Sequence, residues 1–63
     1  MNLLQIKKAV NQNKKVYWNN AAYEVRHWED GQWVVYCTNN DHAVGLTSTD
    51  GKMTHEEKDF YIN

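Results

Sequence analysis

The sequence predicts an α+β fold in which one N-terminal helix precedes a four- or five-stranded antiparallel meander. Apolar residues recur at helical spacing only before residue 13, whereas short runs rich in aromatic and β-branched residues follow residue 15. Clusters of Asn, Asp and Gly separate those runs, as turns separate the strands of a meander. The 63 residues suffice for one small domain, spanning 1–63. Two forms of sheet fit this pattern: a curled SH3-like barrel, or a plain twisted sheet with the helix on one face.

The helix is predicted over about residues 3–12. Asn2 can cap its N-terminus, and Gln5 stands three positions further on, as in a capping box. A helix of this length is marginal in isolation, so it must be held by packing one face against the sheet. The residues of that apolar face are Leu3, Ile6, Ala9 and Val10.

A first strand is predicted at 16–18, a turn at Asn19-Asn20, and a β-hairpin with strands at 23–28 and 32–38. A two-residue Asp30-Gly31 loop would mix charged side chains into the apolar face. A three-residue Glu29-Asp30-Gly31 loop, with Gly31 in the left-handed conformation, separates them, and we predict this register. One face then carries Tyr23, Val25, His27, Trp33, Val35 and Cys37, and the other carries Glu24, Arg26, Trp28, Gln32, Val34 and Tyr36.

The C-terminal third predicts two more strands, at residues 43–47 and 60–62. Polar turns at 39–41 and 49–51 bound the first of them. Thr54, with Glu57 three residues later, is typical of the cap of a short helical turn before the last strand.

Six large aromatic side chains fall between Val16 and Cys37, more than a small domain buries easily. Because one helix cannot cover two faces of a sheet, one face is expected to stay open to a partner. The alternative is that the helix covers the face with Trp28 and Tyr36, so that both faces belong to the core. Aromatic residues edged by polar ones are typical of interaction hot spots. We therefore predict a non-enzymatic role in which the protein binds another protein, or itself as a homodimer, through the surface formed by Trp28, Tyr36, Arg26 and Val34.

Charge is distributed unevenly along the chain, although the net charge is only -1. Lys7, Lys8, Lys14 and Lys15 precede the first acidic residue, and the chain after them has three basic and eight acidic residues, a sum of -5. An alternative function is nucleic-acid binding, with exposed aromatics for stacking and Arg26, Lys14 and Lys15 for phosphate. The acidic residues of the hairpin make that alternative the weaker prediction, because they repel a phosphate backbone.

No catalytic residue, cofactor or metal is predicted. The candidate ligands lack the paired spacing of a structural zinc site, and Cys37 is expected to point into the core, where a thiol stays inert. Phosphate-binding loops and nucleophile elbows do not occur in the sequence. A single cysteine is typical of a reducing cytoplasm, and the longest apolar run, five residues, is too short for a membrane helix, so no membrane association is expected. The candidate ligands are Cys37, Asp41, His27, His42, His55 and Glu56.

Short motifs are spread along most of the chain: Val16-Tyr17-Trp18-Asn19, Tyr23-Glu24-Val25, Gly31-Gln32-Trp33, Gly45-Leu46-Thr47, Asp50-Gly51 and Asp59-Phe60-Tyr61-Ile62. In these motifs the chain resembles small uncharacterised proteins carried by bacteriophages, prophages and plasmids. The resemblance implies a mobile genetic element, the cytoplasm of a bacterial host cell, and a host or phage protein as the partner. It implies no activity and no site residues.

Overall fold

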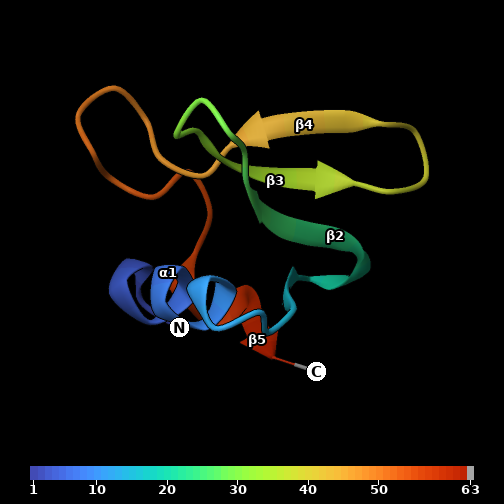
Figure 1. Ribbon diagram of the computed structural model, residues 1–63, viewed down its shortest axis with the longest axis horizontal. Helices are drawn as coiled ribbons and strands as arrows, with labels where there is room; N and C mark the ends of the chain where they lie inside the picture. The colour runs from blue at the N-terminus through green and yellow to red at the C-terminus, as the bar shows by residue number, and fades with distance from the viewer. Residues whose placement is uncertain (63) are drawn as a thin grey trace.

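The computed structural model describes residues 1–62 and contains the predicted helix followed by an antiparallel sheet, which confirms the α+β class (Figure 1). The helix α1 and the strand β5 lie at one end, and the β3–β4 hairpin lies at the other. In chain order the elements are α1 (Leu3–Asn11), β1 (Val16–Trp18), β2 (Asn20–His27), β3 (Trp33–Cys37), β4 (His42–Gly45), the 3-10 helix η1 (Glu57–Asp59) and β5 (Phe60–Ile62).

Helix α1 has the predicted capping box. The Oδ1 atom of Asn2 accepts a hydrogen bond from the backbone N–H of Gln5 at 2.8 Å, and the Oε1 atom of Gln5 accepts one from the N–H of Asn2 at 2.9 Å. At the other end Asn13 has φ 65, and the N–H groups of Asn13 and Lys14 donate to the carbonyls of Val10 and Ala9. These paired bonds form a Schellman motif, which ends the helix one residue before the predicted position.

The sheet has the strand order β4-β3-β2-β1-β5, and every neighbouring pair is antiparallel. The predicted meander is therefore correct for the first four strands and wrong for the last, because β5 crosses back to pair with β1. The barrel alternative is also wrong: β4 and β5 are the two open edges of the sheet and do not pair with each other. Residues 46–56 lead the chain from the β4 edge of the sheet to the β5 edge, and the sheet stays open.

The β2–β3 hairpin has the predicted three-residue loop. Val25 lies opposite Val35 and His27 opposite Trp33, so Glu29, Asp30 and Gly31 form the loop. Gly31 has φ 88, a conformation that costs glycine little and other residues more. The predicted sorting of the two faces follows from this register. Strand β2 begins three residues earlier than predicted, at Asn20, because Asn19 alone (φ 65) turns the chain.

The Thr54 hydroxyl does not cap the turn before β5, contrary to the prediction. Its Oγ1 donates to the carbonyls of Gly45 and Leu46, at 2.7 and 3.1 Å, and η1 begins after Glu56 without a side-chain cap. Thr54 therefore ties the returning chain to the end of β4, which also ends earlier than predicted.

The hydrophobic core lies between α1 and one face of the sheet. Ile6, Val16 and Leu46 are fully buried there. His27, predicted for this face, lies at its exposed margin, stacked on Trp33 with ring centroids 4.0 Å apart. The core comprises Ile6, Ala9, Val16, Val25, Val35, Leu46 and Phe60.

Candidate interaction surface

The side of β2 and β3 that faces away from α1 is called here the outer face. Val25 and Val35 pack in the core with helix residues, so the alternation of a strand directs their neighbours Arg26, Val34 and Tyr36 to the opposite side. Trp28 follows β2 on this same side. The helix therefore covers one face only, and the alternative in which it buries the aromatic residues of the outer face is wrong.

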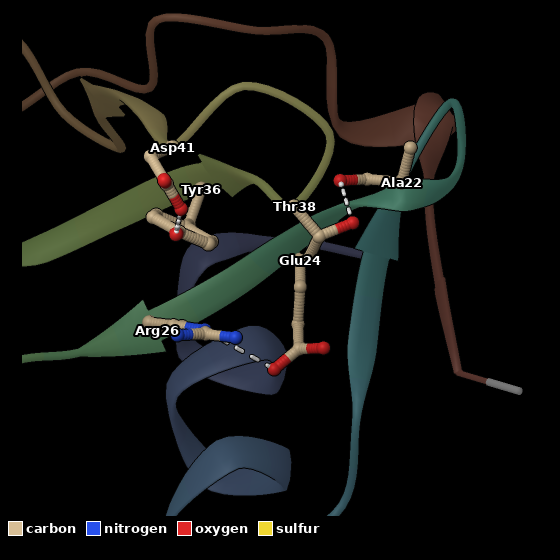
Figure 2. Close-up of polar contacts among 6 residues, drawn as sticks. All are labelled: Ala22, Glu24, Arg26, Tyr36, Thr38 and Asp41. Atoms are coloured by element: carbon tan, nitrogen blue, oxygen red, sulfur yellow. Dashed lines mark hydrogen bonds and ion pairs between the residues drawn. The ribbon is translucent and has the colours of Figure 1, made fainter.

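Arg26 connects two other side chains of the outer face, Glu24 and Tyr36 (Figure 2). Its Nε lies 3.4 Å from Oε1 of Glu24, and its guanidinium carbon lies 4.2 Å from the centre of the Tyr36 ring. The ion pair is partly exposed, so it adds at most about 1 kcal/mol, and the cation–π contact adds a similar amount. Arg26 thus has its charge and its planar face already engaged within the protein.

Tyr36 is held from its other end by Asp41. The Tyr36 hydroxyl donates a hydrogen bond to Oδ1 of Asp41, in the turn between β3 and β4 (Figure 2). This hydrogen bond, together with partial desolvation and the negative charge of Asp41, raises the pKa of Tyr36 above its usual value of 10.0. Both the ring and the hydroxyl of Tyr36 therefore have partners inside the protein.

Trp28 borders a surface depression of about 460 Å³. Val34, only 5% exposed, forms part of its floor, and Gly45, paired with Val34 across the strands, adds no side chain to fill it. Gly31 and Thr47 also line the depression, so the hairpin loop and the segment after β4 meet at this end of the molecule. We call this feature the Trp28 depression.

Trp28 also differs from the other aromatic residues in its contacts with the described part of the chain. The chain has eight Phe, Trp and Tyr residues, and within residues 1–62 each of the other seven contacts an aromatic, histidine or cationic side chain. Even Trp33, on the core face, has His27 stacked on its ring and the Nζ of Lys7 5.5 Å from the ring centroid. Trp28 has no such contact with residues 1–62 and is 40% exposed.

The four residues of the predicted surface lie together on the outer face, but their accessibility differs. Trp28 and Arg26 are exposed and Tyr36 is half-buried, whereas Val34 is buried, contrary to its expected place on an open surface. Val34 is flanked on both sides by neighbouring strands, because it pairs with Arg26 of β2 and with Gly45 of β4. Its contribution is to the floor of the Trp28 depression.

Sequence reasoning missed Asp41, Gly45 and Thr47 as parts of this surface. The sequence pattern places Asp41 only in a turn and among the candidate metal ligands. The pairing of Tyr36 with Ala43 and of Val34 with Gly45 brings all three residues beside the hairpin. Cys37 pairs with His42, so the turn comprises the four residues 38–41, one more than the predicted 39–41, and this longer turn sets the register.

The basic residues of the alternative nucleic-acid surface do not gather around the outer-face aromatics. Arg26 is engaged by Glu24 and Tyr36, and Lys14 lines a different depression, between α1 and β5. Cys37 is buried, as predicted. Within residues 1–62, no group of three or more His, Cys, Asp or Glu side chains lies close enough to hold a metal ion.

Comparison of the chain with protein-family models, curated proteins and solved structures finds no match. None of the helices in the described residues is long and apolar enough to span a membrane.

Proposed function

We propose that this protein is a non-enzymatic accessory protein of a phage or mobile element, and that it binds another protein through the outer face in the bacterial cytoplasm. The observation that carries the proposal is Trp28, an exposed tryptophan with no aromatic or cationic partner within residues 1–62, beside a hollow whose lining includes Val34. Tryptophan is the side chain most enriched among interaction hot spots, and such residues pair with pockets or side chains of a partner.

The neighbouring residues support this role. Glu24, Arg26, Tyr36 and Asp41 form a connected network that holds its side chains in place before any partner arrives. A preorganised surface loses less side-chain entropy on binding than one whose side chains are mobile. The network therefore provides a polar rim beside Trp28, which provides the apolar anchor.

The test is capture of a partner by the full chain and by the double variant Trp28→Ala, Tyr36→Ala. The control is Leu4→Ala, which shortens an apolar side chain that is 76% exposed on α1. We expect one partner from a bacterial host lysate to bind the wild type and the Leu4→Ala variant and to be lost from the double variant. Circular dichroism must show that all three are folded.

Two outcomes would contradict the proposal. A folded double variant that captures the same partner would show that the outer face is not needed. Loss of the partner from the Leu4→Ala variant would place binding on the helix. Light scattering on the eluted wild type distinguishes a second copy from a foreign partner by mass.

A further inference from the structure

The Trp28 depression has a chemical character that defines the side chain it would accept. Its floor is apolar at Val34 and open at Gly45, and one side is the Trp28 ring. The residues that line the depression carry no charge. They are tryptophan, glycine, glutamine, valine, alanine and threonine. A side chain seated there needs an apolar stem and a head group that gains from contact with an indole ring.

The loops bordering this depression are acidic. Glu29 and Asp30 lie between the lining residues Trp28 and Gly31, and Asp50 and Lys52 belong to the turn after Thr47. Three carboxylates and one ammonium give a net charge of -2. Among residues 1–62, none of these three carboxylates forms an ion pair. Hydrogen bonds from the Ser48 hydroxyl and the Lys52 N–H also hold the pKa of Asp50 below its usual value of 3.8.

A cationic side chain satisfies each of these features. Among aromatic side chains, the indole ring of tryptophan attracts a cation over its face most strongly. The surrounding carboxylates add Coulomb attraction for the same cation. The protein already uses the same contact twice internally, for Lys7 on Trp33 and Arg26 on Tyr36. Arginine suits the site better than lysine, because its planar guanidinium stacks on the ring and is more weakly hydrated.

We propose that the Trp28 depression binds an arginine side chain presented by a basic segment of the partner protein. The inference rests on the proposed function and specifies the partner's chemistry. The guanidinium lies on the Trp28 ring near Glu29 and Asp30, and the aliphatic stem covers Val34 in the space left by Gly45.

The experiment uses the full chain labelled with nitrogen-15 and the capped peptide Ac-Gly-Arg-Gly-NH2. The indole N–H signals of the three tryptophans are followed by NMR during the titration, and a Trp28→Phe variant assigns the Trp28 signal. We expect that signal to move and saturate at millimolar peptide, while the signal of Trp18, which does not line the depression, stays in place. The matched peptide carries citrulline, which has nearly the same shape as arginine and no charge, and it should bind several-fold more weakly.

Two protein variants test the two parts of the site. Glu29→Gln with Asp30→Asn removes both charges and keeps an oxygen acceptor for the Gln32 N–H, which Asp30 now holds at 3.1 Å. We expect binding of the arginine peptide to weaken about two- to fivefold. Gly45→Leu fills the depression; a Cβ at Gly45 comes no closer than 3.4 Å to a neighbouring atom, the Thr47 oxygen, so the strand is expected to keep its fold and lose the peptide.

Three results would overturn the inference. Equal binding of the citrulline peptide would show that charge has no role. Unchanged binding to the Gly45→Leu variant would place the peptide elsewhere. A Trp28 signal that moves with protein concentration alone would assign the depression to a second copy of the chain. If the arginine peptide fails while partner capture still depends on Trp28 and Tyr36, the arginine assignment is wrong and the proposed function stands; if both fail, neither stands.

Discussion

Ile6 provides the sharpest test of how α1 is held on the sheet. Its side chain is fully buried in the core with Val25 and Val35. Replacing Ile6 by Val removes one carbon, which costs the transfer free energy of a buried methylene, about 0.8 kcal/mol, and leaves a small cavity. We predict that Ile6→Val lowers the free energy of unfolding by about 0.5–1.5 kcal/mol.

That loss is large for this protein but leaves it folded. A chain of 63 residues has a stability of about 3–9 kcal/mol at ~0.05–0.15 kcal/mol per residue. The melting temperature should fall by about 2–12 °C, from ~4–8 °C per kcal/mol for a domain of this size. Urea and thermal unfolding can be followed by tryptophan fluorescence, because Trp18 and Trp33 pack against the core.

The matched control is Leu4→Ala on the same helix. This change removes three carbons, yet Leu4 is 76% exposed, so we expect a loss below about 0.5 kcal/mol. Removal of one carbon from Ile6 should therefore cost more than removal of three from Leu4. A larger loss from Leu4→Ala, above all one that depends on protein concentration, would refute the reasoning, because it would mean that the exposed side of α1 is buried in an assembly.

Three further predictions concern local features. Asn2→Ala removes the cap of α1 and should lower the free energy of unfolding by about 0.5–2 kcal/mol in urea titrations; an unchanged midpoint would contradict the capping box. Gly31→Ala places a Cβ in open space at φ 88 and should cost about 1–2 kcal/mol from backbone strain alone, whereas Gly45→Ala, with no left-handed angle, should be close to neutral; equal costs would contradict the loop geometry. Asp41→Asn should lower the pKa of Tyr36 toward 10.0, measured by NMR titration of the ring signals, and an unshifted titration would show that Asp41 does not hold the hydroxyl. The pKa is raised because the neutral phenol of Tyr36 is the form that donates the hydrogen bond to Asp41. The stabilisation of the folded state by this hydrogen bond is therefore present below pH 10 and is lost as the pH rises through the raised pKa.

Much of the hairpin was predictable because its two faces differ in polarity. A shift of one residue in register would have exchanged every side chain between the core and the outer face, so the pattern of residues 23–38 selects the three-residue loop. The predicted outer-face pair, Trp28 and Tyr36, lies where this register places it. The burial of its neighbour Val34 was not predictable in the same way, because it depends on the two strands that flank Val34, β2 and β4.

Contacts between distant parts of the chain could not be predicted from the local sequence pattern. Thr54 fits an N-cap by spacing, but its hydroxyl bonds to carbonyls of residues 45 and 46, which only the return of the chain brings near. Likewise, β5 has the composition of any short strand, and its composition does not distinguish a place beside β4 from one beside β1.

By itself the sequence determined the helix, its N-terminal cap, the hairpin loop and the division of aromatic residues between two faces. These features depend on neighbours within a few positions of the chain, where spacing and backbone preference act directly. Only the tertiary structure decided which aromatic ring has no aromatic, histidine or cationic partner in the part of the chain that the structure describes. Arg26 covers Tyr36, Asp41 holds its hydroxyl, and Gly45 leaves the hollow beside Trp28. Each of these features depends on the packing of separate strands, and together they leave Trp28, among residues 1–62, as the ring without an aromatic, histidine or cationic partner.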